Sequence, residues 1–224
     1  MFKIAQQCKD GTLHLVKIPK KYRRDVGKIA EDSFEKAGKL FAYKKPVEVM
    51  IFPRISDIVI PEIGIGGMTT ERGDILLSID FSRRNIGKII TEQLPLSVYH
   101  ELSHVVRGTH VMRGTHDYAV LLDWLVFEGI ASYIERKLFK EKVPYIAPVK
   151  DEMEYWAQAQ KILMKKTSYK ESRKWFFGTE KLPRWIGYRL GYLMIEGYMR
   201  NNPKTSFAKL VRLEAKEILR GYGD

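Results

Sequence analysis

The chain has 224 residues, of which 45% are hydrophobic and 29% are charged, and its formal net charge is +12 at pH 7. This balance is that of an ordinary globular protein, so composition argues against an intrinsically disordered chain and against a fibrous repeat. We therefore expect a protein with a sizeable core, organised as a single domain over residues 1–224.

The first half of the chain contains one predicted helix and three predicted strands. Apolar residues at helical spacing predict an amphipathic helix over residues 21–41. Segments rich in β-branched residues and closed by prolines predict strands over residues 47–52 and 57–60. A third strand, over residues 74–79, follows a glycine-rich turn.

Helices dominate the second half of the chain. Pro95 suits the first turn of a helix that runs to about Arg107 and stops at Gly108. Further helices are predicted over residues 117–140, 151–165, 171–177, 182–200 and 206–219. Strands followed by helices predict an α+β fold, with a small N-terminal mixed sheet within residues 1–92 and a helix-rich part over residues 93–224.

Residues 100–104 read His-Glu-Leu-Ser-His, the pattern H-E-x-x-H, within a predicted helix. Four residues advance an α-helix by about 400°, so His100 and His104 face one side, about 6 Å apart along the axis, and can bind one metal ion. Glu101 is not a ligand in this arrangement, and it takes a proton from the water that zinc activates. The pattern predicts a zinc-dependent hydrolase with Glu101 as the general base.

A catalytic zinc site needs a third protein ligand and an open position. Glu128 is the first candidate, because it is an acid within the otherwise apolar segment of residues 124–131. A carboxylate in such surroundings is costly unless it is paired, hydrogen-bonded or bound to a metal. We favour Glu128 as the ligand, with an ion pair to a basic neighbour such as Arg136 as the structural alternative.

His110 is the second candidate for the third ligand. It follows His104 by six residues, which is the spacing of the metzincin pattern H-E-x-x-H-x-x-G-x-x-H. The glycine of that pattern would fall on Arg107, whereas this chain has its glycine one residue later, at Gly108. The metzincin pattern is therefore incomplete, and Glu128 is preferred to His110.

These motifs resemble those of the gluzincins, metallopeptidases that pair H-E-x-x-H with a later glutamate on a second helix. Residues 124–131, Trp-Leu-Val-Phe-Glu-Gly-Ile-Ala, are similar to the W-L-x-E-G-x-A segment of gluzincin aminopeptidases, with one residue inserted before the glutamate. A closer likeness is to a widespread prokaryotic family of predicted zinc-dependent proteases, which joins H-E-x-x-H, an E-G-x-A helix and a C-terminal Y-R-x-G-Y segment. Residues 188–192, Tyr-Arg-Leu-Gly-Tyr, match that last element, and the likeness covers residues 64–224.

The resemblance implies a zincin-like metalloprotease fold, a Zn²⁺ cofactor held by His100, His104 and Glu128, and a peptide or protein substrate. Thermolysin-like enzymes carry an aspartate one turn after the third ligand, where this chain has Ser132, so another group must orient a ligand histidine. Residues 64–79 resemble the zincin strand that borders the cleft and pairs with the substrate backbone, with a purely structural hairpin as the alternative.

Peptide hydrolysis also requires a hydrogen-bond donor for the oxyanion that develops on the attacked carbonyl. We assign this role to Tyr188, which shares one helical stripe with Arg184 and Tyr192. Gly187 and Gly191 form an adjacent small-residue face that could pack close to the catalytic helices. Packing in the core or at the rim of the site is the alternative role of Tyr188.

The cysteine content and the N-terminal segment bear on the compartment. Cys8 is the only cysteine, which excludes an internal disulfide and suits a reducing compartment. Lys3, Lys9 and Asp10 lie where a secretory signal would have an apolar run. Charged or polar residues interrupt each apolar stretch, so no membrane span is predicted. We expect a cytoplasmic protein, while its oligomeric state is left open.

Three functions fit these residues. The leading hypothesis is a zinc-dependent peptidase, either an endopeptidase or an aminopeptidase. The first alternative is a nucleic-acid-associated metalloprotease, suggested by the charge of +12. The second is a non-catalytic, zinc-stabilised binding module, because a chain can retain a metal site without turnover.

The basic charge is predicted to have no specific nucleic-acid partner. It is spread along the chain, with short clusters at residues 20–24 and 165–174, and no stacking platform or groove-reading motif accompanies it. Any DNA binding should be weak at physiological salt, with dissociation constants of about 10⁻⁶ M or weaker. A titration of labelled duplexes would measure this, and a sequence-selective complex in the nanomolar range would contradict it.

Overall fold

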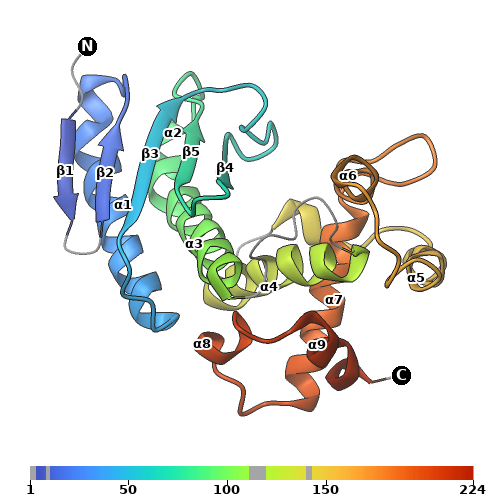
Figure 1. The fold of residues 1–224 in the computed structure, drawn as a ribbon. Helices are drawn as coiled ribbons and strands as arrows, with labels where there is room; N and C mark the ends of the chain where they lie inside the picture. The colour runs from blue at the N-terminus through green and yellow to red at the C-terminus, as the bar shows by residue number, and fades with distance from the viewer. Residues whose placement is uncertain (1–3, 9–10, 111–119, 140–142, 224) are drawn as a thin grey trace. The chain divides into compact units, whose positions relative to one another are not determined.

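The computed structural model of the protein describes residues 4–8, 11–110, 120–139 and 143–223. The chain forms two compact units, Met1–Gly108 and Thr109–Asp224. The first contains a β-sheet and its associated helices, and the described residues of the second contain helices and their connections (Figure 1). The predicted α+β class, a small N-terminal mixed sheet followed by a helix-rich part, is confirmed. That the chain is a single domain stays a prediction.

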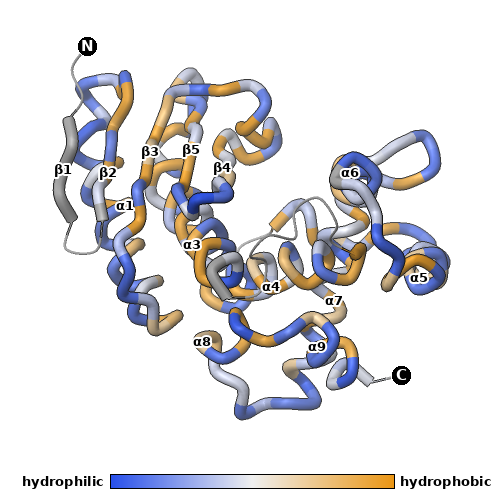
Figure 2. The backbone as a smooth tube through the Cα atoms, in the orientation of Figure 1, coloured by the Kyte–Doolittle hydropathy of each residue, from blue (hydrophilic) through white to orange (hydrophobic). Residues whose placement is uncertain are grey.

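A five-stranded mixed sheet with the order β1-β2-β3-β5-β4 organises the first unit. Its strands are β1 (Ile4–Cys8), β2 (Gly11–Leu15), β3 (Val47–Pro53), β4 (Ile65–Thr69) and β5 (Ile75–Ile79). Strands β2, β3 and β5 run parallel, while β1 and β4 pair antiparallel at the two edges. β3 buries Val47, Val49 and Ile51 on one face, because side chains of a strand alternate between its two faces. The strand is hydrophobic along most of its length (Figure 2).

Helix α1 (Lys20–Leu40) is the crossover that joins the parallel strands β2 and β3, and it packs against β2. It buries Val26, Ala30 and Ala37 at helical spacing and leaves its charged residues on the other side. The predicted helix over residues 21–41 is therefore confirmed, with its bounds shifted by one residue.

A continuous helical run follows the sheet and consists of α2 (Ile86–Lys88), the π-helix η1 (Ile89–Gln93) and α3 (Leu94–His110). Pro95 is the second residue of α3, but it lies inside this run and not at its start. A proline inside a helix removes a backbone hydrogen bond and its ring presses on the preceding turn, and the wider π turn before Pro95 accommodates it. The predicted stop at Gly108 is wrong, because a lone glycine lowers helix propensity without ending a helix.

The strand predictions for the first unit are partly wrong. Residues 57–60 form a turn and a bend, and only Ile60 makes a β-bridge, to Ile65. Strands β1 and β2 are absent from the sequence prediction, because the segments IAQQC and GTLHL contain too few β-branched residues to be distinguished from loops. Pairing with each other and with β3 stabilises these two strands, whose local β-propensity is low.

The second unit is built around the contact between two long helices, α4 and α7. Its helices are α4 (Leu121–Phe139), η2 (Pro144–Ile146), α5 (Glu152–Gln160), α6 (Tyr169–Phe177), α7 (Ile186–Asn201), α8 (Phe207–Leu210) and α9 (Ala215–Tyr222). The first four helices predicted after residue 116 are confirmed as α4, α5, α6 and α7, with bounds that differ by a few residues. Residues 117–119 and 140 of the first prediction lie outside the described residues. No helix in the described part of the chain is long and apolar enough to cross a membrane.

The single helix predicted over residues 206–219 is wrong, because the chain breaks it into α8 and α9. The buried residues Leu210, Leu213 and Ala215 would be spread over about 200° of the circumference of one continuous helix, too wide for one packed face. The break lets all three be buried.

Two glycines allow the backbones of α4 and α7 to touch. A Cβ atom built at Gly191 would lie 2.1 Å from the carbonyl oxygen of Leu125, and one built at Gly129 would lie 2.4 Å from the carbonyl carbon of Gly191. No side chain fits at this crossing. The small-residue face expected on α7 therefore packs against α4 at Gly191, whereas Gly187 packs against Phe176, which lies 2.8 Å from a Cβ atom built there.

We predict that Gly191→Ala lowers the free energy of unfolding by about 3 kcal/mol or more, because the added methyl group would have to displace the α4 backbone. Gly87→Ala is the matched control. Gly87 is helical, and apart from its chain neighbours and the backbone of its own helix no described atom lies within 4 Å of a Cβ atom built there. Alanine should stabilise that position by up to about 1 kcal/mol. Urea unfolding followed by circular dichroism measures both changes, and equal stabilities of the two variants would contradict the packing role of Gly191.

Candidate metal centre and catalytic groups

Helix α3 carries the H-E-x-x-H residues at the predicted spacing. The imidazole rings of His100 and His104 lie side by side, with centroids 4.6 Å apart and planes at 88°. His104 is buried and His100 is half-buried. Leu102 and Val105, on other faces of the same helix, are buried too.

Glu101 is buried, with 4% of its surface exposed, and strand β4 holds it. The hydroxyl group of Thr69 lies 2.9 Å from Oε2 of Glu101 and 3.1 Å from its backbone oxygen, and it can donate to either. A hydrogen bond of this kind lowers the cost of burying a carboxylate and fixes its direction. The candidate general base is thus oriented by the sheet as well as by its own helix.

Gly67 of β4 makes room for the same carboxylate. A Cβ atom built at Gly67 would lie 2.6 Å from Oε1 and 2.7 Å from Cγ of Glu101, distances that real Cβ atoms do not show. Any side chain at Gly67 would displace Glu101. Residues 64–79 are predicted from the sequence to border a cleft, but their two contacts with Glu101 are not, because no sequence pattern reports contacts between residues 32 and 34 positions apart.

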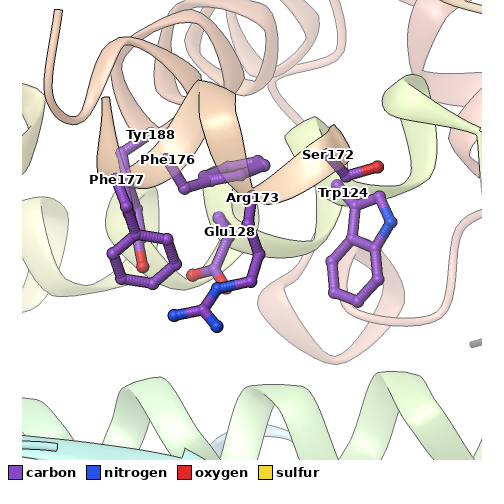
Figure 3. A pocket seen from close by; sticks show the side chains of 7 residues that line it. All are labelled: Trp124, Glu128, Ser172, Arg173, Phe176, Phe177 and Tyr188. Carbon is purple, nitrogen blue, oxygen red and sulfur yellow. The ribbon is translucent and has the colours of Figure 1, made fainter. Parts of the chain in front are cut away.

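Glu128 and Tyr188 come together in the second unit, where both line one pocket (Figure 3). Glu128 is half-buried on α4, and its backbone oxygen accepts a hydrogen bond of 2.8 Å from the hydroxyl group of Ser132. Ser132 is thus bonded within its own helix. Of the stripe predicted on α7, Tyr188 lines the pocket, while Arg184 stacks on Trp185 and Tyr192 bonds to Glu196.

Aromatic rings on two sides fix the position of Tyr188. Its ring centroid lies 5.0 Å from that of Tyr145 and 5.2 Å from that of Phe176. Tyr145 is buried and donates a short hydrogen bond to Glu135, and burial, then the nearby Glu135 carboxylate, raise the pKa of Tyr145 well above its usual value. Tyr145 therefore stays a neutral donor, and its ring packs against that of Tyr188.

The remaining residues of the Y-R-x-G-Y segment each have a structural contact. Arg189 donates to both carboxylate oxygens of Glu152, at 2.7 Å and 3.1 Å, and to the backbone oxygen of Ile146 at 3.1 Å. Hydrogen bonding from Arg189 holds the pKa of Glu152 below its usual value. This bidentate pair ties α5 and η2 to α7, so the segment that carries Tyr188 is anchored at the adjacent residue.

His100, His104 and Glu128 form a group that could hold one metal ion, with one ligand atom from each residue, within the described residues. Two imidazoles and one carboxylate are a donor set of catalytic zinc sites, so the residues present fit this metal. His110 ends α3, and its side chain lies outside what the structure describes, so the metzincin-like alternative has no geometry to compare.

Comparison with solved structures gives a likeness to a peptidase-family protein. The chain is similar to the crystal structure of an aminopeptidase N family protein from Idiomarina loihiensis, with 10% sequence identity and a TM-score of 0.47. The match covers 99% of this chain and 41% of that protein, so the chain spans less than half of its length. No curated protein matches the sequence.

The family comparison covers most of the chain. The model of the family described as "Predicted Zn-dependent protease (DUF2268)" matches residues 26–220, which include the H-E-x-x-H helix, Glu128 and the Y-R-x-G-Y segment. The chain belongs to this family of predicted zinc-dependent proteases.

Proposed function

We propose that this protein is a zinc-dependent peptidase of the gluzincin type, with Zn²⁺ held by His100, His104 and Glu128. The observation that carries the proposal is the buried Glu101 carboxylate, which lies on the same helix as the two histidines and is held by Thr69 and Gly67. A purely structural histidine pair would not need a buried carboxylate beside it. Membership of a family of predicted zinc-dependent proteases supports the same function.

Zinc, when bound, supplies a Lewis acid that lowers the pKa of water to about 7 and polarises the peptide carbonyl. Glu101 accepts one proton from the attacking water as the new C–O bond forms. It then delivers that proton to the amide nitrogen as the C–N bond breaks, which releases an amine and a carboxylic acid. Burial and the Thr69 hydrogen bond keep the Glu101 carboxylate in one orientation for both transfers.

Two further groups of the chain have roles in this proposal. Tyr188 donates its phenolic hydrogen to the oxyanion of the attacked carbonyl, and its contacts with Tyr145 and Phe176 restrict where its hydroxyl group can point. Strand β4 lies at the edge of the sheet. Ile60 already pairs with Ile65 at the start of this strand, so its outer backbone groups after Ile65 are the ones that could pair with an extended peptide. The strand that positions Glu101 would then also position the substrate.

We predict about one zinc ion per chain, bound through His100, His104 and Glu128. Glu128→Ala should reduce the zinc content sharply, because two histidines alone bind zinc weakly, whereas His110→Ala should keep it. Elemental analysis after gel filtration measures the ion, and circular dichroism checks that each variant is folded. The reverse result, zinc lost in His110→Ala and kept in Glu128→Ala, would assign the third position to His110.

We predict that Glu101→Gln lowers the rate of peptide cleavage by about a hundredfold or more, with zinc content and thermal stability near those of the parent. Glutamine keeps the shape of the side chain and its hydrogen bond from Thr69 but cannot accept a proton at neutral pH. A mixed peptide library read by mass spectrometry gives the rate, because the sequence does not distinguish an endopeptidase from an aminopeptidase.

Glu92→Gln is the matched control, since Glu92 is a half-buried carboxylate of the same helical run, in η1. It should cleave the library at the parental rate. Equal rates for Glu101→Gln and the parent would remove Glu101 as the base. A parent that contains zinc and cleaves nothing would favour the non-catalytic binding module.

A further inference from the structure

Among the described residues that line the pocket of Glu128 and Tyr188, Arg173 of α6 is the cationic one. The other lining residues are Trp124, Phe176 and Phe177, with aromatic rings, and the hydroxyl-bearing Ser172. The cavity volume is about 70 Å³, enough for a few waters or for a group of similar size such as a carboxylate. In Figure 3 the side chains of Arg173 and Glu128 extend from their helices in the same direction.

The guanidinium group of Arg173 is held in place by its own helix. It lies over the ring of Phe177, four residues later, with 4.5 Å between the guanidinium carbon and the ring centroid. Arginine stays charged at every physiological pH, and its planar fork of donors matches the two oxygens of a carboxylate. A preoriented guanidinium at an aromatic pocket wall is thus a suitable recognition group for a carboxylate.

The chain around this pocket is strongly cationic. Residues 161–184 contain eight Lys or Arg and two Glu, a formal charge of +6 that is half of the +12 of the whole chain. All eight cationic residues are exposed: Lys161, Lys165, Lys166, Lys170, Arg173, Lys174, Lys181 and Arg184. One of the two acids, Glu171, is neutralised by Lys174, whose ammonium group lies 2.8 Å from both of its oxygens. Such a field attracts an acidic polypeptide and repels a basic one.

Resting on the proposed function, we propose that this pocket is a substrate subsite in which Arg173 binds a carboxylate of the peptide, so that the enzyme prefers acidic substrates. Glu128 is then a ligand of the metal ion, and Arg173 is the cationic group of the described lining that a substrate carboxylate meets. The carboxylate is that of an Asp or Glu side chain or that of the peptide C-terminus.

The chain offers a matched control for Arg173. Arg184 is also exposed, belongs to the same cationic segment and lies over the neighbouring aromatic ring of Trp185 at 4.2 Å, but it does not line the pocket. Arg173→Met and Arg184→Met therefore remove the same charge from the same cationic segment, and only the first removes a side chain that lines the pocket. Both variants would weaken long-range attraction equally. Arg173→Met alone would weaken binding in the subsite.

The test compares kcat/KM for three matched peptides: one with an internal Glu and an amidated C-terminus, one with Gln and a free C-terminus, and one with Gln and an amidated C-terminus. We expect the parent to prefer one of the carboxylate-bearing peptides, which identifies the source of the carboxylate. Arg173→Met should reduce that preference by about tenfold or more, mainly through KM, and Arg184→Met by about twofold or less. Arg173→Glu should reverse the preference for a carboxylate, so that this variant favours a Lys-containing peptide.

Equal losses in Arg173→Met and Arg184→Met, or no preference for a carboxylate in the parent, would overturn the subsite. So would a loss of cleavage of all three peptides in Arg173→Met by the same factor, since Arg173 would then support Glu128 or the transition state. Binding of the same peptides to the Glu101→Gln variant, measured by fluorescence anisotropy, needs no turnover. A carboxylate preference in binding without cleavage by the parent would contradict the proposed function and leave the subsite intact.

Discussion

The burial of the Glu101 carboxylate is the constraint on which the first unit depends. A carboxylate that is 4% exposed needs a hydrogen-bond donor and space, and both come from β4, as the Thr69 hydroxyl group and the missing side chain of Gly67. β4 pairs with β5, and β5 pairs with β3, so the sheet fixes the strand that fixes the carboxylate. The same order leaves β4 at the edge of the sheet, and in the proposed function this strand both orients Glu101 and pairs with a peptide.

A second constraint, the glycine contact between α4 and α7, explains why two distant motifs occur in one chain. Gly129 belongs to the E-G-x-A segment and Gly191 to the Y-R-x-G-Y segment, and the two glycines touch. Glu128 directly precedes Gly129, and Tyr188 lies one turn before Gly191, so this contact brings both side chains to one pocket. Arg189 fixes the same turn of α7 through Glu152. Residues of both motifs therefore have a structural role at the crossing of α4 and α7, in addition to any chemical role.

The sequence predicts the parts of the molecule that have a local signal. α1 and the H-E-x-x-H helix follow from apolar periodicity, and the candidate ligand pair His100 and His104 follows from a spacing of four residues. Strands β1 and β2 have no such signal, because their stability comes from pairing with β3 across the sequence. The contacts of Thr69 and Gly67 with Glu101 are equally non-local, and so is the break that separates α8 from α9 to bury Leu213.

The two arginines that stack on aromatic rings differ in a way that the sequence alone does not predict. Arg173 and Arg184 both lie in a cationic segment, both are exposed, and each guanidinium group lies within 5 Å of an aromatic ring centroid on its own part of the chain. Their local settings are nearly the same, yet Arg173 lines the pocket of Glu128 and Tyr188 and Arg184 does not. The difference arises from the packing of α6 against α7, where Gly187 accepts the ring of Phe176. Which of the two arginines lines the pocket is therefore decided by which turn of a helix faces its neighbour. This is a property of tertiary packing, and the number of charges along the chain does not predict it.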